Sequence, residues 1–344
     1  MNINKKNMTI LGIESSCDET GAAIFTTQDG LCSNELFSQA EQHAQIGGVI
    51  PEHASREHMA KIITIVDSAL EKANKTINDI DAVAVTHKPG LPGALMVGVS
   101  YAKGLAFAAN KKIIGVDHLE GHIFSACIEN NVSFPFVALT VSGGHSALYL
   151  VHDYGNFELL GSTLDDAAGE AFDKVAKLMN LPYPGGPVIE KLASEVNFTD
   201  FFKYPRGNIK DFNFSFSGLK TAVLYHLLEN NAYDQSTKQF LKPDDLEFKR
   251  QVASSLLVCI GDIFENKLQK IFKEYPSVNS FCFVGGVACN KYLRNRLTQA
   301  CNKLKKNLFV PTPKLCTDNA GMIAFVGHYL AQQEKYSSLD LKVF

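Results

Sequence analysis

The sequence contains no apolar run that approaches the roughly 20 residues needed to cross a bilayer. Met1 to Met8 is short and polar before the first apolar run, and so does not match a secretion signal. There is also no low-complexity segment and no short-period repeat, which excludes a linker-like chain or a solenoid. We therefore expect a globular protein of the cytoplasm that makes no contact with a membrane.

Cysteine pairs and an excess of one charge are also missing. The eight cysteines form no Cys-x-x-Cys pair and lie mostly in apolar or helical context, as expected for reduced thiols. Lysine and arginine (33) nearly balance aspartate and glutamate (36), which leaves a net charge of −3. The field of the whole molecule therefore cannot hold a nucleic acid, and such a partner needs a local basic patch or a helper subunit.

One segment is a candidate for such a patch. Its basic residues are interleaved with aromatic ones: Lys203, Arg206, Lys210 and Lys220 with Phe201, Phe202, Tyr204, Phe212, Phe214 and Phe216. Cations can neutralise phosphates and exposed rings can stack on bases, whereas a loop that folds its own phenylalanines inward gives the same pattern. Both interpretations are open from the sequence.

A chain of 344 residues with 46% hydrophobic residues is long enough for two globular domains. Three segments share one design, a short buried strand that runs into a turn of small residues: Ile10 to Ser16, Phe136 to His145 and Phe281 to Asn290. Glycine allows close approach of a ligand to the backbone, and successive amides in such turns form a concavity for anions. The three turns together predict a phosphate-binding site.

The pattern between these turns alternates helices with strands. After the first two turns the chain resumes as a strand (22–26 and 147–151), and after the third it enters a helix (291–305). Further strands are expected at 82–86 and 113–116, and further helices at 56–73, 93–109, 119–130, 168–178, 218–228, 244–273 and 317–332. This alternation predicts α/β layers around a largely buried sheet, with a change of domain near Ser133 to Pro135.

Two histidines and one distant carboxylate form a candidate metal site. On a helix, His118 and His122 lie about 400° apart, which places both on one face, and Asp318 can complete the set. Zinc and ferrous iron accept two imidazoles and a carboxylate with positions left open for substrate. Two unrelated histidines at a helix start would look the same. A zinc peptidase fits poorly, because Glu120 points about 200° away from His118.

The repeated hairpin with a glycine turn, followed by a Gly-Gly turn that opens a helix, resembles the actin, Hsp70 and sugar-kinase superfamily. More specifically, the chain resembles the bacterial TsaD family. The matching motifs are Gly12 to Thr20, Gly47 to Glu52, His118 to His122, Val141 to His145, Asp165 to Lys174, Tyr183 to Pro187, Phe214 to Thr221 and Cys316 to Asn319.

This resemblance implies two duplicated RNase H-like α/β domains with a nucleotide and metal site between them. The expected boundaries are residues 1–133 for the first domain and 134–316 for the second, which carries helical insertions. The C-terminal helix, within 317–344, is expected to pack back on the first domain. The implied reaction moves a threonylcarbamoyl group from its adenylate to the exocyclic amine of adenosine 37, in tRNAs that read codons beginning with adenine.

Site residues follow from the same resemblance. The metal ligands would be His118, His122 and Asp318, and the metal would be divalent, with iron usual in the family and zinc the alternative. The substrate-binding residues would be Thr140, Val141, Ser142, Gly143, Gly144, Asp173, Gly186, Glu190 and Asn290. Glu14 and Asp18 are candidates for catalytic proton handling or positioning, and turn capping is an equal alternative for both.

The resemblance also implies partners, namely tRNA, threonylcarbamoyl-AMP, a TsaB-like paralogue and a TsaE-like ATPase. The helix expected at 56–73 is a candidate partner face, and a helix that packs on its own sheet has the same sequence pattern. Two departures from the family stand out: the turn His87 to Gly93 replaces a glycine by a cation and adds a proline, and the tail after Ser338 lacks arginine and tryptophan. Two other functions stay open, a metallopeptidase and a non-enzymatic actin-like ATP-binding subunit.

Overall fold

The computed structural model describes residues 6–46, 48–207 and 209–343. The start of the polar N-terminus, Gly47 of the motif Gly47 to Glu52, and Phe344 of the tail lie outside the described residues. The chain divides into two compact units, one made of Met1–Asn131 with Pro311–Phe344 and the other of Val132–Val310. Each unit contains a five-stranded mixed sheet.

The first unit is built on a sheet of strand order β3-β2-β1-β4-β5. β1 pairs antiparallel with β2 and parallel with β4, which in turn is parallel to β5. The strands are β1 (Thr9–Glu14), β2 (Glu19–Thr26), β3 (Gly30–Ser38), β4 (Ala82–Lys88) and β5 (Lys112–Asp117). The helices are α1 (Ala40–Ile46), α2 (Pro51–Lys72), α3 (Pro92–Ala108), α4 (His118–Phe124), α10 (Pro313–Cys316) and α11 (Ala320–Gln332).

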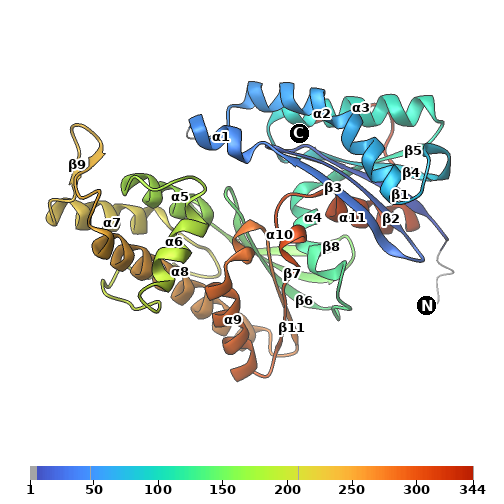
Figure 1. The fold of residues 1–344 in the computed structure, drawn as a ribbon. Helices are drawn as coiled ribbons and strands as arrows, with labels where there is room; N and C mark the ends of the chain where they lie inside the picture. Colours follow the sequence, from blue (N-terminus) through green and yellow to red (C-terminus); the bar gives the residue numbers. More distant parts are fainter. Residues whose placement is uncertain (1–5, 47, 208, 344) are drawn as a thin grey trace. The chain divides into compact units, whose positions relative to one another are not determined.

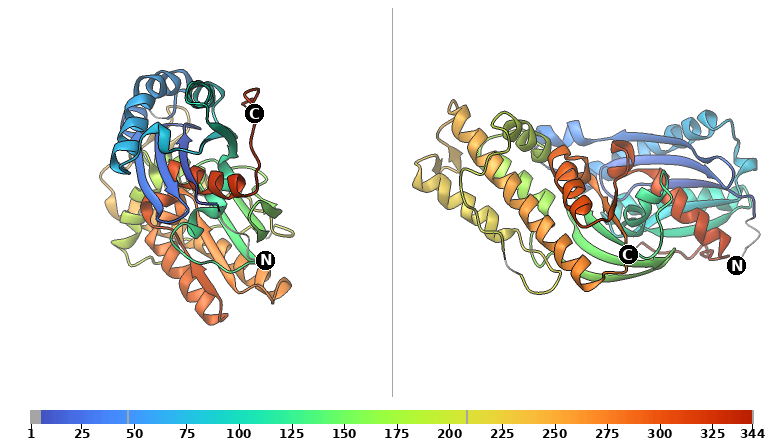
Figure 2. Two further views of the ribbon diagram at one scale, coloured as in Figure 1. Left: turned by 90° about the vertical axis from the view of Figure 1, so that its right-hand side faces the viewer. Right: turned by 90° about the horizontal axis from the view of Figure 1, so that it is seen from below.

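Helices cover both faces of this sheet. α2 and α3 lie side by side over one face, and α11 lies against β1 and β2 on the other (Figures 1 and 2). Residues such as Leu11, Ile13 and Val83 are fully buried between the layers. Because both faces are covered, β1 and β4 are nearly continuous apolar runs rather than alternating ones.

The second unit repeats the arrangement of the first. Its sheet has the order β12-β11-β6-β7-β8, in which β6 is antiparallel to β7 and parallel to β11, as β1 is to β2 and β4. The strands are β6 (Phe136–Val141), β7 (Ser146–Asp153), β8 (Asn156–Ser162), β11 (Ser280–Val284) and β12 (Asn307–Phe309), with a separate hairpin of β9 (Tyr233–Asp234) and β10 (Gln239–Phe240). The helices are α5 (Ala168–Leu178), α6 (Gly185–Ser194), α7 (Ser217–Glu229), α8 (Leu246–Glu274) and α9 (Lys291–Lys303).

This repetition confirms the predicted duplicated α/β fold. The helix expected at 168–178 is α5 with the same bounds, and the one expected at 119–130 is shorter, since α4 ends at Phe124 and gives way to a 3-10 turn (Ser125–Cys127). The helix expected from Thr317 begins at Ala320, because the Asn319 side chain caps it by accepting from the Met322 amide at 3.0 Å.

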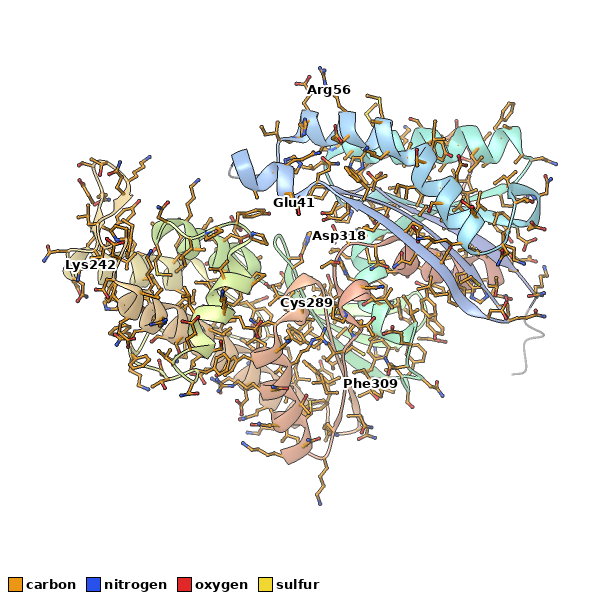
Figure 3. The ribbon with its side chains drawn as sticks, in the orientation of Figure 1. Glu41, Arg56, Lys242, Cys289, Phe309 and Asp318 are labelled. Atoms are coloured by element: carbon orange, nitrogen blue, oxygen red, sulfur yellow. The ribbon has the colours of Figure 1, made fainter. Side chains whose placement is uncertain are left out.

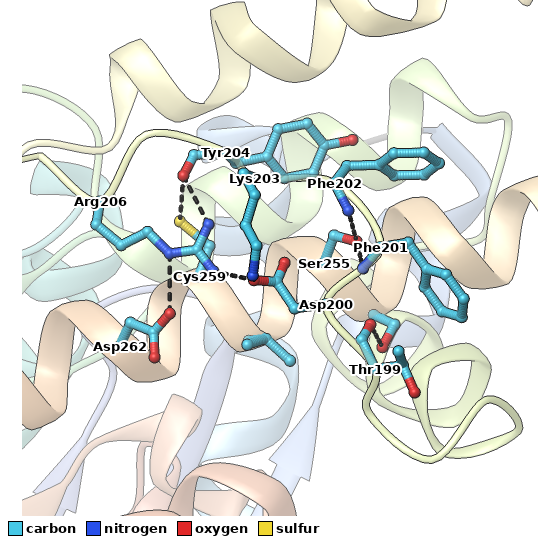
Figure 4. Close-up of polar contacts among 12 residues, drawn as sticks. Thr199, Asp200, Phe201, Phe202, Lys203, Tyr204, Arg206, Ser255, Cys259 and Asp262 are labelled. Carbon is cyan, nitrogen blue, oxygen red and sulfur yellow. Dashed lines mark hydrogen bonds and ion pairs between the residues drawn. The ribbon is translucent and has the colours of Figure 1, made fainter.

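Four of the six aromatic residues of the candidate nucleic-acid segment fold inward. Tyr204, Phe212, Phe214 and Phe216 are buried. Figure 4 shows that Arg206 is occupied as well, because its guanidinium binds Asp262 at 2.8 Å and Asp200 at 2.6 Å. Of the two interpretations that the sequence leaves open, burial in the core therefore holds for these four aromatic residues.

The contact between β1 and α11 leaves no room for a side chain at Gly12. A Cβ at this position would lie 2.5 Å from the Ala324 amide nitrogen and 2.6 Å from the Ala320 carbonyl oxygen. We expect Gly12→Ala to lower the free energy of unfolding by about 1–3 kcal/mol, since backbone atoms cannot move aside. Gly104→Ala on exposed α3, where a Cβ meets nothing within 4 Å, is the matched control and should be neutral or stabilising. Urea unfolding of both variants measures the difference, and equal stabilities would contradict this account of the packing.

Five of the eight cysteines are free thiols: Cys17, Cys32, Cys127, Cys259 and Cys301. Within the described ranges, no helix has both the length and the apolar character needed to cross a membrane.

Candidate functional site

The two histidines lie where β5 passes into α4. β5 ends at Asp117, whose carboxylate accepts a hydrogen bond from the Leu119 amide at 2.8 Å and so caps the helix. The helix therefore begins at His118, and His122 follows about one turn later on the same face. Their ring centroids are 4.7 Å apart, and both side chains are buried.

Asp318 reaches these rings from the segment between α10 and α11, and Figure 3 labels it. Its Oδ1 atom lies 3.0 Å from His122 Nε2 and 3.4 Å from His118 Nε2. One ligand atom from each of the three residues lies within 4.8 Å of the others. The fold thus brings the carboxylate of Asp318 to two imidazoles that lie 196 residues or more before it in the sequence.

Glu14 stands behind His118 at the end of β1. It is fully buried, and its Oε2 atom lies 3.1 Å from His118 Nδ1 and accepts from the Thr86 hydroxyl at 2.6 Å. Its Oε1 atom accepts from the Ser16 amide at 2.5 Å. A carboxylate that holds the second nitrogen of a ligating histidine fixes the tautomer and the direction of the ring. This geometry suits Glu14 to positioning His118.

The charges of the cluster fit a bound cation. Burial alone would lower the pKa of His118, but the carboxylates of Asp318 and Glu14 raise that pKa well above its ordinary value. Burial would likewise raise the pKa of Asp318, but His118 and His122 hold it well below its usual range. With His118 Nδ1 donating to Glu14, His118 Nε2 and Asp318 Oδ1 face one another as electron-pair donors, so a proton or a metal ion has to bridge them. Two imidazoles and a carboxylate are a suitable donor set for a divalent metal.

Asp18 and Glu19 add further acidity beside this cluster. Asp18 is half-buried in the turn before β2, and Glu19 accepts a hydrogen bond from the Ser38 hydroxyl at 2.9 Å. Burial, followed by the nearby charges of Asp318 and Asp18, raises the pKa of Glu19 to about 10. Glu19 lies in the motif Gly12 to Thr20, but nothing in the sequence singles it out. Its raised pKa depends on burial and on Asp318, which is distant in the sequence.

The unusual turn at His87 to Gly93 supports the metal cluster from one side. The Leu91 amide donates to the Ser16 carbonyl at 2.7 Å, and a Cβ on Gly90 would lie 2.6 Å from the same oxygen. Lys88 Nζ lies 3.7 Å from the carboxylate of Asp117, the residue that caps α4. The added cation therefore pairs with the end of β5.

Glu120 does not face the histidines' ligand atoms. Its carboxylate accepts a hydrogen bond from the Tyr329 hydroxyl of α11, and burial raises its pKa. A zinc peptidase needs this carboxylate beside the metal-bound water. The position of Glu120 therefore argues against the peptidase alternative.

A second cluster lies in the other unit, at the end of β6. Thr140 and Val141 are the last residues of this strand, and the turn Ser142 to Gly144 is closed by a hydrogen bond of 2.8 Å from the Ser142 amide to the His145 carbonyl. Gly143 and Gly144 are exposed. The Thr140 hydroxyl is buried and has no hydrogen-bond partner among the described residues, which is uncommon for a buried polar group.

The other residues expected to bind substrate gather around two helix starts. Asp173 accepts from the Gly185 amide at 2.7 Å, beside Gly186 at the start of α6. Asn290 caps α9 by accepting from the Leu293 amide at 2.9 Å, and Glu190 accepts from the Tyr292 amide at 2.9 Å.

Gly285 joins this group to the end of β6. Its φ is +91°, and a Cβ there would lie 2.4 Å from the Val141 carbonyl oxygen. Only glycine can hold the chain this close in this conformation. The nine residues therefore lie in one connected region of the second unit, where the amino ends of α6 and α9 favour an anion.

Comparison with known proteins assigns the chain to a family. Residues 30–325 match the model of TsaD, tRNA N6-adenosine threonylcarbamoyltransferase. The chain is 42% identical over 340 residues to the tRNA N6-adenosine threonylcarbamoyltransferase of Brachyspira hyodysenteriae, covering 98% of this chain and 96% of that protein.

Solved structures share the fold at low identity. Full-length HypF in a phosphate- and nucleotide-bound form superposes with a TM-score of 0.62 at 15% identity, over 96% of this chain and 47% of that one. Component A of the (R)-2-hydroxyglutaryl-CoA dehydratase of Acidaminococcus fermentans gives 0.53 at 14% identity, over 95% and 99%. These likenesses confirm the actin-like fold. The chain belongs to the TsaD family of tRNA N6-adenosine threonylcarbamoyltransferases, and its activity is the formation of threonylcarbamoyladenosine in tRNA.

Proposed function

We propose that the threonylcarbamoyl donor is threonylcarbamoyl-adenylate and that the second unit binds it. The backbone amides of Ser142, Gly143 and Gly144 suit phosphate oxygens, and the amino ends of α6 and α9 add favourable partial charge. Asp173, Glu190 and Asn290 can exchange hydrogen bonds with the ribose and base, and Gly186 leaves room beside them. The unpartnered Thr140 hydroxyl supports a polar ligand at the end of β6.

For the first unit, we propose that His118, His122 and Asp318 hold one divalent metal, iron as is usual in the family, with zinc as the alternative. When bound, such an ion would supply a Lewis acid. Glu14 keeps the Nε2 lone pair of His118 directed toward Asp318. The observation that carries the proposal is the convergence of these three side chains in a chain that belongs to this family.

The chemistry requires little from the protein beyond positioning. The exocyclic amine of adenosine forms a C–N bond with the carbamoyl carbon, the C–O bond to the adenylate breaks, and AMP leaves with that electron pair. The amine loses one proton, and Asp18, half-buried beside the metal cluster, is our candidate to accept it. Because a mixed anhydride has a good leaving group, orientation and charge stabilisation can supply most of the rate enhancement.

We further propose that the enzyme works in the cytoplasm with a TsaB-like paralogue and a TsaE-like ATPase, as the family resemblance implies. The face of α2 and α3 that points away from the sheet suits the paralogue. It exposes Met59 (60%) and Ile63 (58%) on α2 and Phe107 (76%) on α3. Arg56 on α2 also points outward (Figure 3). Aromatic and methionine side chains are enriched in interfaces.

A charge placed on this face should separate the two proteins. We expect Ile63→Glu to weaken association with the paralogue by at least about tenfold, because the carboxylate would be buried without a partner. Leu159→Glu, at a 56% exposed leucine of β8, is the matched control and should bind normally. Calorimetric titration measures both affinities, and normal binding by Ile63→Glu would place the partner elsewhere.

The direct test of the donor is reconstitution. The purified chain is incubated with threonylcarbamoyl-adenylate and unmodified tRNA, with and without the two helpers, and the digested tRNA is analysed by mass spectrometry. We expect threonylcarbamoyladenosine to appear. Its absence in the presence of helpers known to be active would refute the proposed donor reaction and favour the nucleotide-binding scaffold.

A further inference from the structure

A cavity of about 520 Å³ opens on α9 in the second unit. Its walls carry an aromatic pair, Phe198 and Tyr292, together with Glu265 of α8 and polar residues of α9: Lys291, Asn295, Arg296, Gln299 and Lys303. Asn290, which precedes α9, belongs to the proposed donor site, so the cavity begins next to that site along the helix. Figure 3 labels Cys289 at this end of α9.

The aromatic pair is arranged as a flat wall. The rings of Phe198 and Tyr292 stack with centroids 4.6 Å apart and planes inclined by 26°. Asn197 and Phe198 both have φ of +53°, a left-handed conformation that is unfavourable for a residue as bulky as phenylalanine. Such strained positions persist where the surroundings enforce them, and they concentrate at binding sites.

The wall is also fixed by hydrogen bonds and ion pairs of Arg296 and Glu265, which line the cavity too. Arg296 donates to the Tyr292 hydroxyl at 3.0 Å and to Glu265 at 2.8 Å, and it forms an ion pair with Asp262. The two acidic residues belong to α8, so they hold the α9 side chains in place before any ligand arrives. A preorganised aromatic surface loses little entropy when a base stacks on it.

The charge of α9 is unlike that of the whole chain. Its sequence contains Lys291, Arg294, Arg296 and Lys303 and no acidic residue, in a chain whose net charge is −3. Lys291 and Lys303 are exposed and form no ion pair with any other described residue. They are separated by twelve residues, or about 18 Å along the helix. A single nucleotide cannot reach both amines, whereas a chain of several nucleotides can.

We propose that this face of α9 binds the acceptor tRNA, with Lys291 and Lys303 on backbone phosphates and an unstacked base against the wall of Phe198 and Tyr292. The inference rests on the proposed function, in which tRNA is the acceptor, and adds where part of the tRNA binds. Single-stranded RNA is recognised in this way, by cations along the backbone and aromatic rings on the bases. The modest net charge of the chain is then compatible with RNA binding, because the cations are concentrated on one helix.

The test measures fluorescence anisotropy of labelled, unmodified tRNA with the full chain and its actin-like helper, over a range of salt concentrations. We expect Lys291→Glu with Lys303→Glu to weaken binding roughly tenfold or more and to reduce the salt slope by about 1.4 to 1.8. The control is Lys238→Glu with Lys242→Glu at the β9–β10 hairpin, which changes the net charge equally; Figure 3 labels Lys242. This control variant should change tRNA binding by less than about twofold.

A second pair of variants tests the wall. Tyr292→Ala should weaken binding by about 5-fold to 150-fold, whereas Tyr292→Phe keeps the ring and should bind normally. Equal loss in both double-lysine variants, or loss in neither, overturns the proposal. Loss of AMP binding with normal tRNA binding also overturns it, because the cavity then takes the adenosine of the donor. Product formation by the unaltered enzyme is measured in parallel, so a failure of the proposed function is seen separately.

Discussion

Asp318→Ala is expected to abolish threonylcarbamoyladenosine formation, with a loss of roughly 1,000-fold or more, and to reduce bound metal to the background level. Asp318 provides the carboxylate whose Oδ1 atom lies 3.0 Å from His122 Nε2 and 3.4 Å from His118 Nε2. Without this carboxylate only the two imidazoles remain, and a divalent ion loses the one anionic ligand among the three. Metal content by elemental mass spectrometry gives a readout that does not depend on activity.

Glu120→Gln is the control for this experiment. Glutamine keeps the shape of the side chain and can still accept from the Tyr329 hydroxyl. Both metal content and product formation should therefore be unchanged. Full metal binding by Asp318→Ala would contradict the assigned ligands, and loss of product in Glu120→Gln with metal still bound would give Glu120 a role in the transfer.

The second large effect is expected at Glu14, the buried carboxylate behind His118. Glu14→Ala leaves the Ser16 amide, the Thr86 hydroxyl and His118 Nδ1 without their acceptor, and should lower the free energy of unfolding by about 3–5 kcal/mol. Glu14→Gln keeps the volume but removes the charge that helps to raise the pKa of His118. We expect its metal affinity to fall by about 10- to 100-fold with a smaller loss of stability.

Two measurements separate these effects. Urea unfolding of the metal-free proteins gives the stability of each variant, and titration with the metal at fixed pH gives its affinity. A Glu14→Gln variant with unchanged metal affinity would show that the carboxylate is only a packing element. Glu19 does not take the place of Glu14, since its carboxyl group accepts a hydrogen bond from the Ser38 hydroxyl at 2.9 Å.

The sequence was sufficient for the buried strands and their turns, because these are continuous apolar runs that end in small residues. It also placed His118, His122 and Asp318 in one site. Edge strands β3 and β8 were missed, since their burial is mixed and their sequence does not alternate clearly. α6 was missed because it begins in a segment rich in glycine and proline, Tyr183 to Pro187, that reads as a loop.

Interactions between distant segments were the part that the sequence could not supply. The role of Glu14 depends on His118, 104 residues later, and the pKa of Glu19 depends on Asp318. The same limit applies to the aromatic segment near Tyr204, where stacking on bases and burial in the core have one sequence pattern. In the structure, Phe214 packs against Phe264 of α8, so this ring belongs to the core.

The ratio of AMP to threonylcarbamoyladenosine tests whether the group passes directly from the adenylate to adenosine of tRNA. The enzyme with its helpers is given a limiting amount of threonylcarbamoyl-adenylate and excess unmodified tRNA, and AMP and threonylcarbamoyladenosine are quantified over time. We expect equal amounts of the two products and no AMP release above the background rate when tRNA is omitted. AMP that accumulates without modified adenosine would mean that the enzyme hydrolyses the donor, and would contradict the account.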